Sequence, residues 1–285
     1  MTQDSGKSPS ALSVEWREWL VENLLLGVEA EDLLEVLVKG GVDAELARAA
    51  LLAETQDPHF QGVVRVAQMQ RKMETLLDVY AEFFRQSGAH QQVDRHAALS
   101  ADAFFERYYF RNRPVVVQGA LTGWAALGEW TLARLTERLG LTQGTVSLLE
   151  REEWKPLLAE FHPPRGYAAE DLQASAPRLS LEPAGSELPL GPLRKNLLRC
   201  QVSGRCVLQL VPSFELHRLT REEEEAAPPA LRLNVELAAG EMLLLPVGWW
   251  YRLQAPEDSL AVTFEGFALP ERNTAWLLDH RDTGR

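Results

Sequence analysis

The hydrophobic pattern of this 285-residue chain changes from helical to strand-like near Ser87-Gly88. Before that point apolar residues recur every three to four positions, which is typical of amphipathic helices. Four helices are predicted there: one capped by Ser13, one over residues 30–39, one over 43–55 capped by Asp43, and one from Asp57-Pro58 to about Arg85. After it, short apolar runs alternate with Gly and Pro turn signals. This order predicts an α+β fold whose strands form a sandwich or a barrel.

The fourth predicted helix carries a stripe of large apolar residues at helical spacing. They are Met69, Met73, Leu76, Leu77, Tyr80 and Phe84. We expect this stripe to pack in a core or between domains rather than to bind a cofactor.

The second part of the chain is expected to hold helices over residues 99–111 and 130–139 and many strands. Strands are predicted over residues 114–117, 145–149, 197–202, 205–211, 231–237, 242–246, 250–253 and 260–267. The two that flank Ser203-Gly204 have the spacing of a β-hairpin. Residues 163–192 are expected to be irregular, and residues 273–279 to form a short closing helix. We therefore expect a disordered tail (1–12), a helical region (13–90) and a strand-rich domain (91–285).

Charge and composition exclude several classes of partner. Asp and Glu number 41 against 29 Lys and Arg, a net charge of -12. Nucleic acid and anionic membranes need a basic face, so neither is an expected partner. The sequence shows no apolar run of ~18–20 residues and no secretory signal at its start. We expect a cytoplasmic protein, in which Cys200 and Cys206 stay reduced, although a disulfide across the predicted hairpin remains open.

Three segments in this order resemble one protein family. They are residues 110–119 (FRNRPVVVQG), 196–212 (NLLRCQVSGRCVLQLVP) and 240–251 (GEMLLLPVGWWY). They are similar to the cupin-like, JmjC-type Fe(II)- and 2-oxoglutarate-dependent oxygenases, in the branch that includes protein hydroxylases. The helical leader, residues 15–23 onward, resembles that of bacterial members. The resemblance covers residues 99–267 and implies a double-stranded β-helix, a jelly-roll barrel whose mouth holds the metal.

The resemblance also implies where such a site would lie. The family holds Fe(II) with a His-x-Asp pair and a later His, and holds 2-oxoglutarate with a Lys. Counting back from Asn196, the His-x-Asp positions are occupied here by Leu190 and Pro192. The later His position, after the Trp-Trp pair, is Tyr251, and the Lys position, two residues after Gly204, is Cys206. Leu and Pro have no donor atom, and one phenol does not make a triad. We therefore predict neither metal, nor cofactor, nor catalytic residue in the family's manner.

Three functions follow from this departure. The first is a non-catalytic module that binds a protein or peptide, and that forms a homodimer through its helices. The second is an active hydroxylase with Fe(II) and 2-oxoglutarate at a rebuilt centre, for which the candidate ligands are Glu160, His162, Glu215 and His217 beside Tyr251. The third is a metal-independent binder of a small apolar ligand. The candidate pocket is formed by Leu190, Pro192, Asn196, Cys206, Trp249 and Tyr251.

Overall fold

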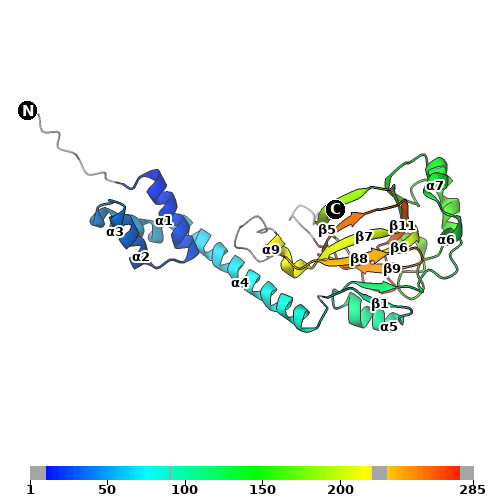
Figure 1. Cartoon of the computed structure of the whole chain (residues 1–285). Helices are drawn as coiled ribbons and strands as arrows, with labels where there is room; N and C mark the ends of the chain where they lie inside the picture. The colour runs from blue at the N-terminus through cyan, green and yellow to red at the C-terminus, as the bar shows by residue number, and fades with distance from the viewer. Residues whose placement is uncertain (1–10, 90, 220–229, 277–285) are drawn as a thin grey trace, which may run out of the picture. The chain divides into compact units, whose positions relative to one another are not determined.

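The computed structural model describes residues 11–89, 91–219 and 230–276. Helices dominate the first part of the chain and antiparallel sheets the second, which confirms the predicted α+β class (Figure 1). The chain divides into two compact units, Met1–Leu77 and Asp78–Arg285. The boundary between the units therefore falls inside a helix, between residues 77 and 78. The sequence pattern places the domain boundary later, at residue 90. The expected tail, residues 1–12, lies almost wholly outside the described residues.

The helical unit contains α1 (Val14–Leu26), α2 (Ala30–Lys39), α3 (Ala44–Gln56) and the first part of α4 (Pro58–Gln86). Two predicted caps are confirmed. Ser13 accepts a hydrogen bond from the Trp16 amide, and Asp43 accepts two from the first turn of α3. Each cap satisfies amide groups that have no partner within the helix. Local sequence signals therefore set these helix starts.

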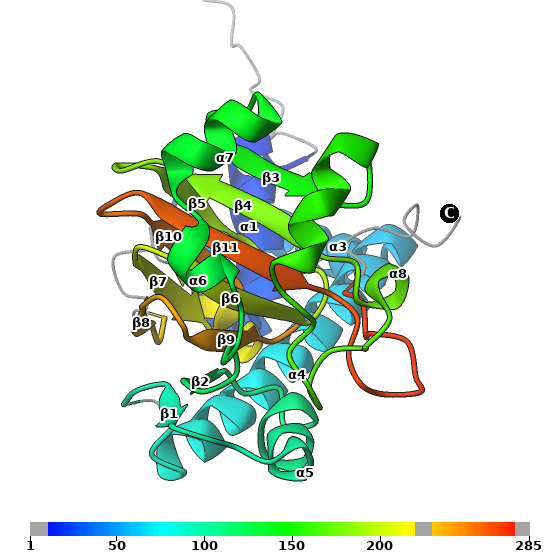
Figure 2. The same ribbon diagram turned by 90° about the vertical axis from the view of Figure 1, so that its right-hand side faces the viewer.

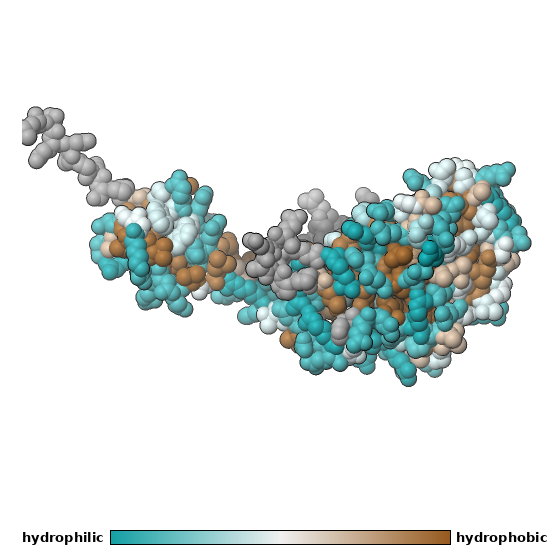
Figure 3. Space-filling view, viewed as in Figure 1, coloured by the Kyte–Doolittle hydropathy of each residue, from teal (hydrophilic) through white to brown (hydrophobic). Residues whose placement is uncertain are grey.

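The core of the helical unit is small. Its fully buried residues are Leu20, Leu33, Leu37 and Ala47. Apolar residues also gather on its surface between hydrophilic ones (Figure 3), and Leu26 and Leu52 are exposed. Little apolar area is therefore removed from water within this unit.

Four of the six members of the predicted apolar stripe on α4 are exposed rather than packed in a core. Met69, Met73, Leu76 and Tyr80 each have between 45% and 58% of their surface accessible. In the second half of the helix Phe84 is buried, as expected. Periodicity shows which residues share a helix face, but it does not show what covers that face.

The strand-rich unit contains two sheets. The seven-stranded sheet has the order β1-β2-β9-β6-β11-β4-β3, and the four-stranded sheet the order β5-β10-β7-β8. Only the β1–β2 pair is parallel among the described strands. The strands are β1 (Asp94–His96), β2 (Val115–Val117), β3 (Gly144–Ser147), β4 (Arg178–Glu182), β5 (Glu187–Pro192), β6 (Leu197–Ser203), β7 (Cys206–Val211), β8 (Leu233–Leu237), β9 (Met242–Leu245), β10 (Trp250–Gln254) and β11 (Ser259–Phe264).

Short helices accompany the sheets. They are α5 (Ala101–Phe104) with the π-helix η1 (Phe105–Tyr109), α6 (Ala126–Glu129), α7 (Leu132–Leu139), the 3-10 helix η2 (Glu152–Ala159), α8 (Leu172–Ser175), the 3-10 helix η3 (Ser213–Glu215) and α9 (Leu216–Leu219). Figure 2 looks onto α6 and α7, with the seven-stranded sheet behind them. Leu135 of α7 belongs to the same buried cluster as Leu198, Cys200 and Val262 of that sheet. These helices therefore cover its outer face.

Three sequence predictions for this unit were wrong. The stretch 163–192 is not irregular throughout, because it contains α8, β4 and β5. The strands on either side of Ser203-Gly204 do not form a hairpin: β6 belongs to one sheet and β7 to the other. The described part of the expected closing helix is not helical, since Ala275 forms a β-bridge with Lys195. Residues 277–279 of that helix lie outside the described residues.

The sheet change separates the two cysteines. Cys200 packs in the cluster on the outer face of the seven-stranded sheet, whereas Cys206 packs in the cluster between the sheets. Both are buried and free. Burial raises the pKa of both thiols, so both are neutral at neutral pH.

No helix in the described ranges combines the length and the apolar character that crossing a bilayer requires.

Candidate functional site

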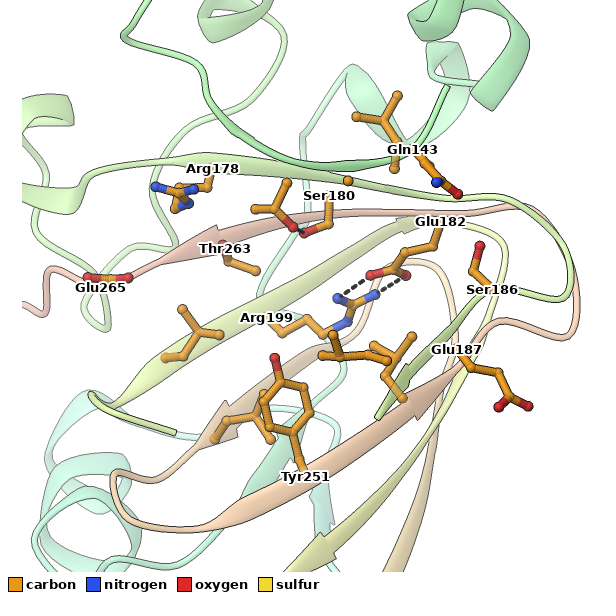
Figure 4. Close-up of a pocket in the computed structure, with 17 residues that line it drawn as sticks. Gln143, Arg178, Ser180, Glu182, Ser186, Glu187, Arg199, Tyr251, Thr263 and Glu265 are labelled. Carbon is orange, nitrogen blue, oxygen red and sulfur yellow. Dashed lines mark hydrogen bonds and ion pairs between the residues drawn. The ribbon is translucent and has the colours of Figure 1, made fainter. Parts of the chain in front are cut away.

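A cavity of about 410 Å³ lies between the inner faces of the two sheets (Figure 4). It is lined by residues of β4, β6, β9 and β11 from the larger sheet and of β5 and β10 from the smaller one. Exposed residues of the edge strands β3 and β5, such as Gly144 and Leu188, belong to its rim. A cavity of this size and position is typical of a ligand or substrate site.

Strand alternation places polar side chains inside. On β6, Leu198 and Cys200 face the helices on the outer side, so Arg199 and Gln201 face the space between the sheets. The same alternation directs Glu182 of β4 inward. The interior is therefore apolar at one end, around Leu208 and Leu243, and polar at the cavity.

The centre of the cavity is an ion pair between Arg199 and Glu182. The guanidinium donates two parallel hydrogen bonds, from Nη1 to Oε1 at 2.9 Å and from Nη2 to Oε2 at 2.6 Å (Figure 4). The side chains are 5% and 15% exposed, respectively. A bidentate pair with so little exposure is fixed in one geometry, because each charge would otherwise be left without a partner.

A short hydrogen-bond chain holds the pair in place. Ser259 donates to Glu182 Oε2 at 2.8 Å, and the Gln201 amide donates to Ser259 Oγ at 2.9 Å. Gln201 Oε1 in turn accepts from Arg199 Nη2 at 3.2 Å and from the Cys206 thiol at 3.4 Å. Arg199 Nε is buried and has no hydrogen-bond partner in the described part of the chain.

Tyr251 enters the cavity from the opposite sheet. On β10 it lies beside Gly191 of β5 and Leu210 of β7, and its ring points toward Arg199 (Figure 4). Burial raises the pKa of its phenol, against the opposing influence of the Arg199 charge. The phenol therefore keeps its proton at neutral pH and is a hydrogen-bonding group rather than an anionic ligand.

Of the six residues predicted to form a pocket, only Tyr251 lines this cavity. Leu190 and Pro192 lie on β5 but are not among its lining residues. Asn196 instead accepts from the Val247 amide at 2.9 Å and donates to Asn273 at 3.0 Å. These contacts fix the chain after β9 and give Asn196 a structural role.

Cys206 and Trp249 are not among the lining residues either. Both belong to the buried apolar cluster between the sheets, and the Cys206 thiol also donates to Gln201 in the network around the ion pair. The Trp249 indole donates to Asn112 Oδ1 at 2.7 Å, which ties it to the loop before β2. The expected apolar pocket with one phenol is therefore replaced by a cavity whose wall carries an ion pair.

The four residues considered for a rebuilt metal centre lie outside the cavity. Glu160 accepts from the Trp130 indole at 2.7 Å and from Arg138 at 3.0 Å. His162 follows two residues later in the chain, with Nδ1 3.0 Å from the Pro163 carbonyl. These two residues are thus engaged in the loops that pack around α6 and α7.

The second pair is engaged just as firmly. Glu215 is fully buried and forms ion pairs with Arg85 and Arg218, each at 3.2 Å. His217 Nε2 lies 3.0 Å from Asp78 Oδ1. Two cations on one carboxylate leave no vacant lone pair directed at a shared metal position.

The cavity does not fit the iron and 2-oxoglutarate of the resembled family. Among the described residues that line it there is no histidine, and its central carboxylate is held by Arg199. Over the same described ranges, no three His, Cys, Asp or Glu side chains gather as a potential metal site. The donor set therefore lacks the two imidazoles and free carboxylate that a facial triad requires.

Sequence reasoning missed the pair at the centre of the site. Arg199 and Gln201 alternate with Leu198, Cys200 and Val202, a pattern that signals a two-faced strand. It does not tell whether the polar face meets water or a second sheet. Glu182 lies in the stretch that was expected to be irregular, so no strand pattern pointed to it.

In comparisons with known proteins, no family model matches the chain, and no curated protein matches its sequence.

Proposed function

We propose that the chain is a non-catalytic member of the cupin-like, JmjC-type oxygenase group, and that its barrel binds a protein or peptide segment. The order of the strands supports the barrel part of this proposal. Strands β4, β6, β9 and β11 belong to one sheet and β5, β7, β8 and β10 to the other. A chain that passes between two facing antiparallel sheets in this manner is typical of a jelly-roll.

The observation that carries the non-catalytic part is the Arg199–Glu182 pair. It occupies the interior cavity with a cation and an anion that already satisfy each other. An oxygenase of this type needs open metal positions and an uncompensated cation for its acidic co-substrate. Here the central cation of the cavity is already paired with the Glu182 carboxylate, and no histidine is among the described lining residues, in agreement with the replaced positions Leu190, Pro192, Tyr251 and Cys206.

The rim of the cavity is the proposed binding surface. Leu188 lines the cavity and is 43% exposed, with Glu187 beside it on the edge strand β5. An exposed apolar residue next to polar groups at a cavity mouth suits a partner segment that inserts one side chain.

A peptide-library selection on the immobilised full chain tests the binding function. We expect enriched peptides that bind at least ~tenfold more weakly to a Leu188→Asp variant, because the charge opposes burial of an apolar anchor. A Leu52→Asp variant is the matched control, since Leu52 is exposed in the other unit. The proposed surface would be contradicted if both variants lost the same amount of peptide affinity, or if the selection enriched no peptide.

An assay of 2-oxoglutarate consumption tests the absence of catalysis on the same preparation. With Fe(II), ascorbate and any enriched peptide present, we expect no consumption above that of the metal-free sample. Peptide-dependent consumption of 2-oxoglutarate would overturn the proposal and would support an active hydroxylase instead.

One observation favours a second function, the binding of a small molecule. A volume of about 410 Å³ lined by polar residues such as Arg178 and Ser180 suits a compact ligand with hydrogen-bond acceptors. Such a ligand would be more polar than the apolar one expected from the sequence. A ligand-induced rise in Tm in the absence of any enriched peptide would favour this function instead.

A further inference from the structure

One row of side chains crosses the inner face of the seven-stranded sheet at the cavity. Thr263 of β11 is paired directly with Arg178 of β4 on one side and with Arg199 of β6 on the other. Residues directly opposite each other on neighbouring strands share a face, with Cβ atoms roughly 5 Å apart. Figure 4 shows Thr263 between the two arginines. All three residues line the cavity, so its wall carries a hydroxyl flanked by two guanidinium groups.

The two arginines of this row differ in their partners. Arg199 is neutralised by Glu182 through two hydrogen bonds. Arg178 is partly buried, and it makes no hydrogen bond or ion pair with any residue that the structure describes. Arginine carries its charge throughout the physiological pH range. The row therefore holds one positive charge that no group in the described part of the chain balances.

The acidic residues at the edges of the cavity do not supply the missing partner. Glu265 is held by Lys195, whose ammonium donates to its carboxylate at 3.1 Å. Glu187 accepts a hydrogen bond from the Gln254 amide at 3.0 Å and is exposed on the edge strand β5. Among the described residues that line the cavity, Arg178 is thus the cation without an anion.

Two hydroxyl groups of the cavity also lack partners. Thr263 is only 6% exposed, yet its hydroxyl makes no hydrogen bond to any other described residue. The phenol of Tyr251, which enters from the opposite sheet and keeps its proton, likewise has no hydrogen-bond partner within the described ranges. Each can donate one hydrogen bond to an acceptor atom. Because a buried polar group without a partner costs free energy, both groups gain from contact with a ligand that carries acceptor oxygens.

We propose that this row binds the carboxylate of an acidic side chain, Asp or Glu, in the partner segment whose other contact is Leu188. This inference rests on the proposed peptide-binding function and adds the chemical class of the inserted residue. A carboxylate accepts two parallel hydrogen bonds from the planar guanidinium of Arg178, and its single charge balances that of the arginine. A doubly charged phosphate would bring one negative charge more than the site balances.

A double-mutant cycle between the full chain and its peptide tests this assignment. Peptides enriched by the selection should share an Asp or Glu at one position. Changing that residue to its amide, or Arg178→Gln in the protein, should each weaken binding at least ~tenfold. Both changes together should weaken it little further than one, because the same contact is lost. Arg178→Lys should restore part of the affinity, since the charge returns without the planar fork.

The matched control is Arg252→Gln. Arg252 is exposed and lies between Tyr251 and Leu253 on β10, so strand alternation directs it away from the cavity. The variant removes the same charge from the same unit and should leave the affinity for the peptide unchanged. The Tm of the free protein should be the same for Arg178→Gln as for the wild type, because no contact within the described chain is lost.

A small probe separates this inference from the proposed function. N-acetylglutamate α-amide should raise the Tm of the full chain but not that of the Arg178→Gln variant. N-acetylglutamine α-amide at equal ionic strength should raise neither. A rise of this kind without any enriched peptide would support the carboxylate site and contradict the peptide function.

The reverse outcome is equally clear. Enriched peptides that lose affinity with Leu188→Asp but keep it with Arg178→Gln would retain the peptide function and overturn this inference. Equal effects of Arg178→Gln and Arg252→Gln would overturn it too. The same holds if the probe leaves the Tm unchanged and the enriched peptides share no acidic residue.

Discussion

Arg199 and Glu182 meet between two sheets, where both side chains have little exposure to water. A buried ion pair recovers by mutual attraction what both ions lose in hydration, so the pair adds little net stability compared with apolar residues. Removing one partner is different, because the remaining charge stays buried alone. Ser259 and Gln201 complete the network and fix which oxygen faces which nitrogen.

A double-mutant cycle measures this dependence. Arg199→Met and Glu182→Met should each lower the free energy of unfolding by about 3–5 kcal/mol, since each leaves an uncompensated charge. The double variant should be more stable than the sum of the two losses implies, because no charge then remains. Urea unfolding of the wild type, the two single variants and the double variant gives the coupling free energy between the two side chains. Additive losses would mean that the two side chains do not depend on each other.

At the scale of elements, the connection between β6 and β7 decides the architecture. Gly204 lies in it with φ at +64°, and a Cβ added there would lie 2.0 Å from the Asp258 carbonyl oxygen. The chain thus passes from one sheet to the other at a point where the next turn, before β11, presses against it. Only glycine meets both the conformational and the steric requirement.

Gly204→Ala should therefore destabilise the protein by about 3 kcal/mol or more, because backbone must move to accept the methyl group. Gly185→Ala is the control. Gly185 also has a positive φ, +83°, but no atom lies within 4 Å of its added Cβ. Gly185→Ala should lower the free energy of unfolding by only about 1–2 kcal/mol, which is the cost of the left-handed conformation alone. Thermal unfolding of both variants provides the comparison; equal losses would show that the close approach to Asp258 has no influence.

At the scale of the whole molecule, the two units differ in how much apolar surface they bury. The helical unit has the small core of Leu20, Leu33, Leu37 and Ala47, whereas the strand-rich unit has two large clusters. Because burial of apolar area is the main stabilising contribution, we expect the helical unit to be the less stable of the two.

Urea unfolding should consequently show two steps. Part of the helical signal in far-UV circular dichroism should be lost before Cys200 and Cys206, both in the strand-rich unit, become reactive toward a thiol reagent. In the folded unit these thiols are buried and their raised pKa keeps them protonated. A single transition in which dichroism and thiol reactivity coincide would contradict this order.

Local signals in the sequence were sufficient for the four helices before residue 90 and for most strands after residue 196, but not for α8, β4 and β5 or for the end of the chain. Ser13 and Asp43 act on amide groups two or three residues away, so their effect is visible in the sequence itself. The partners of a strand are not local. Ser203-Gly204 looks like a hairpin turn, but its neighbouring strands join different sheets. For the same reason the cavity, which depends on the register of β4 and β6 across β11, could not be predicted from spacing alone.

The strand order also has a consequence for synthesis on the ribosome. Strand β5 acquires its neighbour only when β10, residues 250–254, has emerged, and β4 and β6 are joined only by β11, residues 259–264. A nascent chain must therefore carry several unpaired, apolar strand edges until translation has passed those residues. Mutations that slow this last pairing would lower the yield of folded protein in the cell even where the finished molecule is stable.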